Sequence, residues 1–447
     1  MESPPPEHDP STFPGLRDAS RPVPQEADVV VVGAGVVGLA TARELAVGGT
    51  RVVVVDRGTA GLGASFGNGG LVPPSHSIPL STPATIRKAI PWMLDPESPF
   101  YIRPRLDPRL IAFLVRFAAA SRADHVRRAI PAMRDLNRLS VERLRAVAGD
   151  LGGVGYRVDG LLNVYRTTAG FAAGQRDAAI LADHGLSSRT LSGAETRAQE
   201  PALTGAIAGG VLWPQDGSVD PVRLTAALVA DLRRRDVPVV EGIEVLELHT
   251  NGARREVRTA AGTIRVNAVV LAGGSSSVRL LCRQTGTVPV QPAKGYSVTI
   301  RNPTVRLRRP LLLVESKVAV TPMGDSLRLA GTLELAGSDR TLAPRRVRAV
   351  HAAGRAYLGA ATDGDAVEVW SGLRALSGDG LPIIGRMPRA PWIAIATGHG
   401  HVGVGMSAGT GALLGALLLD NDPPIDPAPY DPARFMVLGA RRRRFRR

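Results

Sequence analysis

The first strongly patterned stretch of the chain is a run of apolar residues that leads into closely spaced glycines. Residues 28–32 are almost entirely valine, Gly33, Gly35 and Gly38 follow within a small-residue segment, and a later valine run ends at Asp56. This order predicts a buried strand, a tight turn, a helix and a second parallel strand. In such a unit the first glycine makes the turn, the second lets a pyrophosphate approach the backbone, and the third lets the helix pack closely on the strand.

A dinucleotide is the ligand that this unit favours. A pyrophosphate would lie at the N-terminus of the predicted helix, where free N–H groups attract negative charge. Asp56 stands where an acid can accept hydrogen bonds from a ribose. The alternatives are a glycine-rich turn without a ligand and a turn carboxylate at the strand end. Because strand, glycines, helix, second strand and acid occur in order, we predict a nucleotide-binding unit.

The rest of the pattern alternates between helical and strand periods. Helices are predicted through 84–150, around 171–184, over 221–235 with Asp220 as N-cap, over 344–358 and over the apolar stretch 402–419; strands are predicted at 160–167, 209–214 and 268–274, with antiparallel strands through 294–335. The stretch 402–419 is apolar enough to imitate a membrane span, but its glycines and context favour a buried helix. Segments that favour parallel strands therefore lie before and after segments that favour antiparallel strands and helices. This order predicts an α/β fold with interleaved domains.

Composition narrows the class of protein. With 447 residues and 44% hydrophobic residues, the chain can bury more than one core. Its single cysteine, Cys282, excludes an internal disulfide framework and is compatible with a cytoplasmic setting. The first 26 residues are proline-rich and lack an apolar core, so we predict a disordered segment that is not a secretory signal.

The net charge of +15 is concentrated in arginine, since only three of the 55 basic residues are lysine. Codon usage of a GC-rich genome explains part of this excess. The terminus ARRRRFRR at 440–447 carries another part of the charge. This terminus is either a solvated end or a peripheral contact with an anionic membrane at the inner face of the plasma membrane. No aromatic-interleaved basic motif accompanies it, so nucleic acid is not the expected partner.

Several further motifs, in order, resemble one family. They are GAGVVGLATARELA at 33–46, SFGNGGLVPP at 65–74, KAIPWM at 88–93, GGVLWPQDGSVDP at 209–221, PAKGYSVTI at 292–300, SGLRALSGDGLPIIGR at 371–386 and ATGHGHVGVGMSAGTG at 396–411. Over roughly residues 27–435 the chain resembles the small subunit of D-amino acid dehydrogenases, within the D-amino-acid-oxidase-like (DAO) FAD-dependent oxidoreductases. The resemblance implies a Rossmann-like three-layer FAD-binding domain interleaved with an antiparallel substrate domain.

That resemblance also implies domain boundaries. The FAD-binding domain would comprise 27–90, 215–285 and 371–435, the substrate domain 91–214 and 286–370, and the ends 1–26 and 436–447 would be disordered.

The resemblance and the motifs together assign the cofactor residues. FAD would contact Val32, Gly33, Gly35, Val36, Val37, Gly38, Asp56, Arg57, Ser65, Asn68, Gly69, Gly70, Leu71, Val245, Ala272, Gly273, Gly398, His399, Gly400, His401, Val402 and Gly403. The N-terminus of the helix predicted from 402 would stabilise reduced flavin by its dipole. His399 and His401 lack a carboxylate cluster, so no metal is expected. The segment SGLRALSGDG contains no cysteine, so FAD is expected to be non-covalent.

For the substrate, the resemblance points to Arg374, which would grip a carboxylate through two parallel hydrogen bonds. A salt bridge to Asp379 is the alternative role of this arginine. Tyr296 would close the site over the carboxylate, or belong to the core. Lys294 and His76 are weaker candidates, more typical of surface or loop positions.

The expected reaction is hydride transfer from the α-carbon of a D-amino acid to flavin N5, with electrons passed to a quinone or another respiratory acceptor. The alternatives are an oxidase or dehydrogenase of glycine, sarcosine or D-hydroxyproline, a non-catalytic flavin-binding protein, and a nucleic-acid-binding protein.

Overall fold

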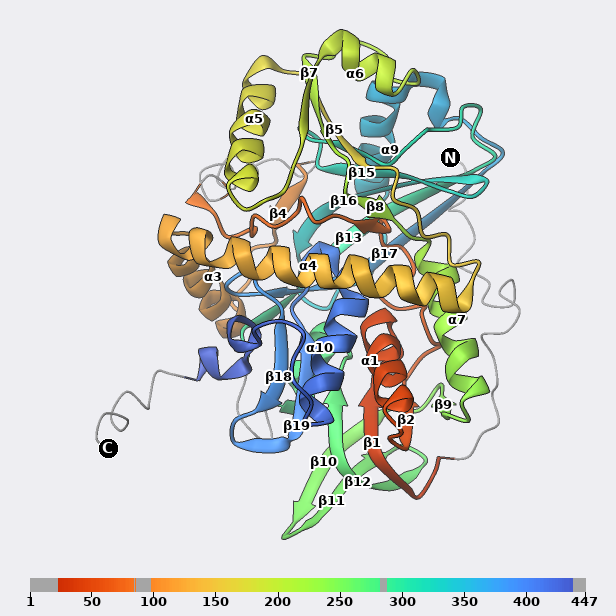
Figure 1. The fold of residues 1–447 in the computed structure, drawn as a ribbon, viewed down its shortest axis with the longest axis vertical. Coiled ribbons are helices and arrows are strands. Elements are labelled where there is room, and N and C mark those ends of the chain that lie inside the picture. The colour runs from red at the N-terminus through yellow and green to blue at the C-terminus, as the bar shows by residue number, and fades with distance from the viewer. Residues whose placement is uncertain (1–22, 84, 86–97, 282–287, 437–447) are drawn as a thin grey trace.

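The computed structural model describes residues 23–83, 85, 98–281 and 288–436. Four features of the sequence fall outside these ranges: most of the first 26 residues, the KAIPWM motif, Cys282 and the arginine-rich terminus. Within them the chain forms two main sheets, one in the lower half of Figure 1 and one in the upper half, with the long helix α4 (Ala123–Leu151) crossing between them. This arrangement confirms the predicted α/β class with two interleaved parts.

The first sheet is built on the predicted glycine unit. Strand β1 pairs in parallel with β2 on one side and with β12 on the other, and β9 and β19 extend the parallel part. Antiparallel β10, β11 and β18 complete it. The strands are β1 (Glu26–Val32), β2 (Val52–Val55), β9 (Val239–Val240), β10 (Val245–Asn251), β11 (Arg254–Thr259), β12 (Gly262–Leu271), β18 (Ile383–Met387) and β19 (Ala390–Thr397).

Both faces of this sheet are buried, which is why β1 and β2 are nearly all valine. Val29 and Val31 pack into a core formed with helices, whereas Val30 between them packs into a second core with β10 and β19. Helices α1 (Val36–Val47), α7 (Pro221–Arg234) and α10 (Ser407–Leu418) join α4 on the first side. The short α8 (Ser277–Leu281) lies on the second side. The result is the three-layer arrangement typical of nucleotide-binding domains.

The second sheet is mostly antiparallel and contains the remaining long strands. Its order is β17-β13-β16-β15-β14-β5-β7-β6, with β4 paired to β16. The strands are β4 (Phe100–Ile102), β5 (Leu161–Tyr165), β6 (Arg189–Ser192), β7 (Gly209–Trp213), β13 (Val290–Arg301), β14 (Leu311–Leu313), β15 (Val318–Met323), β16 (Ser326–Leu335) and β17 (Ala366–Ser377). Helices α3 (Pro108–Ala120), α5 (Thr168–Ala182), α6 (Gly193–Gln199) and α9 (Pro344–Leu358) surround it. A small ribbon, β3 (Leu71–Val72) with β8 (Gly217–Ser218), completes the described strands.

Three local predictions differ from the structure. The region 84–150 is not uniformly helical, because Phe100–Ile102 forms β4 through a parallel pairing with β16. The predicted domain boundary before residue 371 falls inside β17, which pairs with β13 along its whole length. The apolar helix expected from 402 begins at Ser407, since a 3-10 turn occupies Gly400–Val402 and an added Cβ on Gly405 would lie 2.6 Å from the Leu71 carbonyl oxygen.

Helix α10 is buried, as predicted for the apolar stretch near the C-terminus. In the described part of the chain, no helix combines the length and apolarity that crossing a bilayer requires.

Candidate cofactor and substrate site

A cavity of about 440 Å³ lies at the carboxyl ends of β1, β2 and β12 and extends to β17. This is the edge at which parallel α/β sheets bind their ligands. The predicted residues on its wall are Val32, Gly33, Gly35, Val36, Val37, Asp56, Arg57, Ser65, Asn68, Val245, Ala272, Gly273, Arg374, His399, Gly400 and Gly403. Segments from both ends of the sequence therefore meet at one cavity.

The three glycines of the first turn have different surroundings. Gly33 has φ +115°, and an added Cβ would lie 2.7 Å from the Ala272 backbone. An added Cβ on Gly38 would lie 1.9 Å from the Gly33 carbonyl oxygen, so the helix and strand touch there. At Gly35 the same atom would meet only the Ser65 Oγ, at 3.4 Å. The backbone is thus open at Gly35, on the cavity side.

Two side chains hold this turn in place. The Asp56 carboxylate accepts hydrogen bonds from the Ala34 N–H at 2.7 Å and from the Gly58 N–H at 2.8 Å. The Ser65 Oγ accepts from the Val36 N–H at 3.0 Å, in the first turn of α1. Asp56 therefore organises the turn and also lines the cavity, so the ribose and turn roles are compatible.

The loop after Ser65 is tied to the second sheet and to the C-terminal glycine segment. The buried Arg328 of β16 donates to the Phe66 carbonyl at 2.6 Å, and the Thr321 hydroxyl donates to the Gly69 carbonyl at 2.6 Å. The Asn68 amide donates to the His401 carbonyl at 3.3 Å. These bonds bring the 65–70 loop against the 398–403 segment, although the two are far apart in sequence.

The C-terminal glycine segment presents a neutral histidine to the cavity. Burial lowers the pKa of His399 to about 4, and its Nε2 lies 2.9 Å from the Thr410 hydroxyl. The neighbouring wall is backbone from Gly400 and Gly403. His399 precedes the 3-10 turn Gly400–Val402 and α10 starts only at Ser407, so the contact of a helix N-terminus with the flavin stays a prediction.

Arg374 lies on β17 at the other end of the cavity wall. Its guanidinium donates to the Thr332 carbonyl and, at 3.5 Å, to the Gly331 carbonyl. Thr332 has φ +63°, an unusual value for a β-branched residue. The guanidinium also packs on Gly295, where an added Cβ would lie 2.2 Å from its carbon. Burial lowers the pKa of Arg374 to about 10, which leaves it charged at neutral pH.

Asp379, the alternative partner that the sequence offered for Arg374, forms an ion pair with another residue. Asp379 pairs with Arg434 at 2.8 Å. Within the described ranges, the ion pairs of the chain do not include one between Arg374 and a carboxylate. Among the residues that the structure describes, the Arg374 guanidinium is therefore hydrogen-bonded only to backbone carbonyls, which suits it to bind an anionic ligand group.

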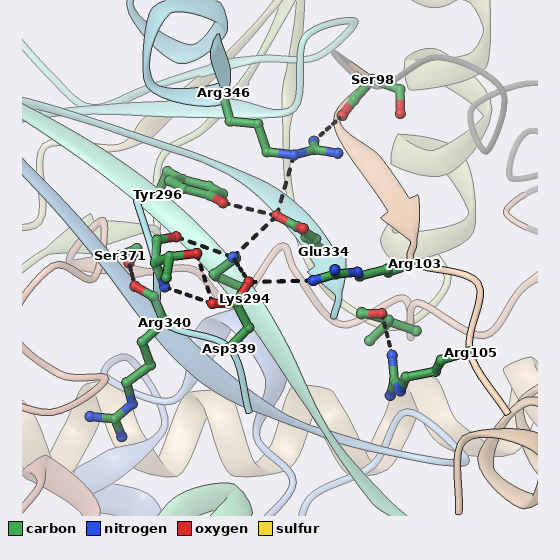
Figure 2. Close-up of polar contacts among 12 residues, drawn as sticks. Ser98, Arg103, Arg105, Lys294, Tyr296, Glu334, Asp339, Arg340, Arg346 and Ser371 are labelled. Carbon is green, nitrogen blue, oxygen red and sulfur yellow. Dashed lines mark hydrogen bonds and ion pairs between the residues drawn. The ribbon is translucent and has the colours of Figure 1, made fainter. Parts of the chain in front are cut away.

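Tyr296 does not line the cavity. Its side chain is fully buried, and its hydroxyl donates to Glu334 at 2.9 Å. Burial and Glu334 raise the pKa of Tyr296, which keeps the hydroxyl protonated. Lys294, expected at a surface or loop, is also buried and lies 3.0 Å from Asp339 and 3.8 Å from Glu334. Figure 2 shows these groups as one cluster with Arg346.

This buried cluster supports a cavity residue that the sequence did not suggest. Arg340 lies beside Asp339, and its carbonyl accepts a hydrogen bond from the Ser371 hydroxyl at 2.7 Å. In Figure 2 its guanidinium extends away from the cluster, and Arg340 lines the same cavity as Arg374. The other wall residues not predicted are Gly58, Thr59, Gly61, Leu62, Gly63, Ala64, Glu244, Leu271, Gly274, Ser275, Ser276, Ser277, Arg279, Leu280, Leu373, Ala375, Ala396, Thr397 and Val404.

The remaining predicted cofactor residues do not line the cavity. They are Gly38, Gly69, Gly70, Leu71, Gly398, His401 and Val402. Gly70 and Gly398 have φ +66° and +79°, values that favour glycine. His401 is exposed, and its ring lies 5.6 Å from that of His76. Their contact with FAD stays a prediction.

The fold is that of an α/β nucleotide-binding protein, and its cavity is lined by the first sheet and by residues of β17 in the second sheet. The chain belongs to the DAO family of FAD-dependent oxidoreductases, whose model matches residues 28–417. The glycine turn fits such a cofactor, because Gly35 lies on the cavity wall without a side chain that would project from it.

Relatives and solved structures agree with this assignment. The chain is 38% identical to a D-amino acid dehydrogenase of Paramagnetospirillum magneticum, over 87% of this chain and 94% of that protein. It is 34% identical to a D-amino acid dehydrogenase of Cereibacter sphaeroides, over 93% and 97%. A glycine oxidase from Geobacillus kaustophilus shares the fold with TM-score 0.75 at 24% identity, covering 91% of this chain and 98% of that one.

A buried carboxyl group outside the cavity wall is expected to make stability depend on pH. Asp216 is fully buried and accepts two hydrogen bonds from Ser75, and burial raises its pKa from 3.8 to about 8. Between these values the folded state binds one more proton than the unfolded state, so stability falls as pH rises. We expect Asp216→Asn to remove this contribution and to raise the melting temperature at pH 8 by several degrees, with little change at pH 4. Thermal unfolding of both proteins across this range measures the effect, and parallel pH profiles would contradict it.

Proposed function

We propose that this chain catalyses the FAD-dependent oxidative deamination of D-amino acids. The proposal is supported by the printed names of relatives that cover nearly the whole chain. The single observation that carries it is Arg374, a charged guanidinium on the wall of the cofactor cavity without a carboxylate partner among the described residues. A substrate carboxylate would complete the hydrogen bonding of this group.

The protein residues would bind and orient the substrate. Arg374 would hold the carboxylate, and the rigid contacts to Thr332 and Gly295 would fix the guanidinium before the substrate arrives. Bound FAD would supply the two-electron chemistry by accepting a hydride from the α-carbon. The resulting imino acid would hydrolyse in water to a 2-oxo acid and ammonia.

The cofactor would be held without a covalent bond. The turn around Gly35, Asp56 and Ser65 would contact its diphosphate and ribose, and His399 with Gly400 would face the ring system. Within SGLRALSGDG the chain has no cysteine, and Cys282 is outside the described residues. Acid precipitation should therefore release all of the flavin into the supernatant.

The electron acceptor would be a quinone or another respiratory carrier. The arginine-rich terminus would keep the enzyme at an anionic inner leaflet for this purpose. Stopped-flow mixing of the reduced protein with oxygen and with a quinone analogue tests this proposal. Faster reoxidation by the quinone analogue is expected, whereas faster reoxidation by oxygen would favour an oxidase of glycine, sarcosine or D-hydroxyproline.

Tyr296 remains a predicted site residue, and one substitution can distinguish a role in stability from a role in substrate binding. Because its hydroxyl bonds to the buried Glu334, we expect Tyr296→Phe to lower the free energy of unfolding by about 1–2 kcal/mol. We expect KM for the amino acid to stay within about threefold, since this hydroxyl does not line the cavity. Denaturant unfolding and steady-state kinetics measure the two effects. A tenfold rise in KM at unchanged stability would instead place the hydroxyl on the substrate.

A further inference from the structure

The substrate arginine is supported by an irregular part of the second sheet. Lys294 of β13 pairs with Glu334 of β16. Two residues later Tyr296 pairs with Gly331, which is three residues away from Glu334. The extra residue on β16 makes a β-bulge, a feature that often lies next to active sites. Thr332 belongs to this bulge, and its carbonyl, with that of Gly331, accepts the hydrogen bonds of the guanidinium.

The bulge holds Thr332 in an unfavourable backbone conformation. Its φ is +63°, and β-branched residues rarely adopt such a left-handed value. This conformation costs free energy and persists only where the surrounding contacts hold it. The contacts that hold the bulge are therefore candidates for setting the position of Arg374.

Opposite faces of β13 contact the arginine and the buried ionic cluster. Successive side chains of a strand point to opposite faces. Gly295 lies against the guanidinium, since an added Cβ would lie 2.2 Å from the Arg374 carbon. Its two neighbours, Lys294 and Tyr296, point to the other face and converge on Glu334 (Figure 2). The cluster is thus on the other face of the strands that support the arginine.

Glu334 joins the end of the bulge to this cluster. Its carboxylate accepts a hydrogen bond from the Tyr296 hydroxyl at 2.9 Å. The same carboxylate lies 3.3 Å from Arg346 Nε and 3.8 Å from Lys294 Nζ. Glu334 is 8% exposed, and both cations are exposed even less. Attraction between charges is stronger in such a buried setting than at the surface, so Glu334 is held firmly.

Lys294 also has a second charged partner. Its Nζ donates to Asp339 at 3.0 Å and to the Thr341 carbonyl at 3.2 Å. Hydrogen bonds from the Thr341 N–H and hydroxyl, and then that from Lys294, lower the pKa of Asp339 to about 2. Lys294 therefore keeps an ionised partner when Glu334 is replaced by a neutral residue of the same shape.

We propose that Glu334 is a positioning residue for Arg374. Its carboxylate, held by two buried cations, fixes the end of the bulge, and the bulge carbonyls orient the guanidinium before the substrate arrives. A guanidinium oriented in advance binds a carboxylate with a smaller loss of conformational freedom. The inference rests on the proposed function, because it takes Arg374 to bind the substrate carboxylate.

Titration of the FAD-loaded full-length protein with pyruvate and with pyruvamide tests the proposal through the spectrum of the oxidised flavin. Pyruvate is the simplest 2-oxo acid, and its amide lacks the charge that Arg374 recognises. We expect Glu334→Gln to raise the Kd for pyruvate by about tenfold, since a displacement of about 1 Å can cost up to about 100-fold. The Kd for pyruvamide should stay within about twofold, because a neutral amide does not form the charge-assisted pair.

Two further variants separate positioning from a general defect. Arg346→Gln removes one of the cations beside Glu334 and should also raise the Kd for pyruvate. Adding Thr332→Gly to Glu334→Gln should bring this Kd back toward the wild-type value, because glycine adopts φ +63° without steric cost. A purely structural role of Glu334 predicts no such rescue.

The matched control is Glu315→Gln. This carboxylate lies just beyond β14 in the same sheet and also accepts a hydrogen bond from a tyrosine hydroxyl, that of Tyr357, at 2.8 Å. Because Glu315 does not line the cavity, its variant should bind both probes like the wild type. The ratio of flavin to protein absorbance verifies that each variant is folded.

Arg374→Ala separates failure of this inference from failure of the proposed function. If it raises the Kd for pyruvate while Glu334→Gln and Arg346→Gln leave that Kd unchanged, the positioning role is refuted and the proposed function stands. Equal weakening of pyruvate and pyruvamide in Glu334→Gln would also refute the positioning role. If pyruvate does not change the wild-type spectrum, or binds Arg374→Ala equally well, the proposed carboxylate site fails and this inference fails with it.

Discussion

Replacement of Arg374 by alanine is expected to raise the apparent KM for the best D-amino acid by about 100-fold or more. The two hydrogen bonds that its guanidinium can offer to a carboxylate are charge-assisted, and such bonds contribute roughly 1.5–3 kcal/mol each. A loss of about 3 kcal/mol corresponds to the expected change. Steady-state kinetics with a soluble dye as acceptor measure it.

Two further substitutions distinguish this anchoring from a general defect. Arg374→Lys keeps the charge but not the planar pair of donors, so its KM should lie between those of wild type and Arg374→Ala. Gly295→Ala would place a methyl group 2.2 Å from the guanidinium carbon and should raise KM by displacing Arg374. The flavin content of all three should match the wild type. An unchanged KM in Arg374→Ala would refute the anchoring role.

The second large effect is expected at Gly38. A methyl group there would lie 1.9 Å from the Gly33 carbonyl oxygen, and neither backbone segment can move without separating α1 from β1. We expect Gly38→Ala to lower the free energy of unfolding by about 3 kcal/mol and to yield protein with little FAD. Denaturant unfolding and the ratio of flavin to protein absorbance measure the two consequences.

Gly35→Ala tests FAD binding separately from folding. Its methyl group would contact only the Ser65 Oγ, so the protein should fold with nearly wild-type stability. Because Gly35 lies on the cavity wall, the methyl group should nevertheless weaken FAD binding by about tenfold or more. Gly149→Ala, on the exposed side of α4 with open space around it, is the neutral control. Equal FAD affinity in Gly35→Ala and wild type would contradict the proposed cofactor position.

The parts of the fold that sequence predicts well are those set by local pattern. The valine strands and the glycine turn between residues 28 and 56 have the expected order because each element follows from its own periodicity. Helix α9 spans Pro344–Leu358, the predicted range, since Pro344 occupies its first turn and Gly359 follows its end. The spacing of Gly33, Gly35 and Gly38 alone was enough to assign the turn to the first, the approach of a ligand to the second and the close packing of helix and strand to the third.

The features that sequence could not predict depend on distant partners. Strand β4 exists because Phe100–Ile102 pairs with β16, more than 200 residues away. Lys294 is buried because Asp339 and Glu334 compensate its charge from another strand and a loop. Arg340 reaches the cavity because that cluster and Ser371 hold its loop. The late start of α10 likewise reflects contact between Gly405 and Leu71.

The most direct measurement is anaerobic titration of the reconstituted FAD protein with D-amino acids and their L enantiomers. We predict that at least one D-amino acid abolishes the blue absorbance of the flavin, that its enantiomer does not, and that Arg374→Ala requires a far higher concentration for the same change. A protein that dithionite bleaches but no D-amino acid does would contradict the proposal that this cavity oxidises them.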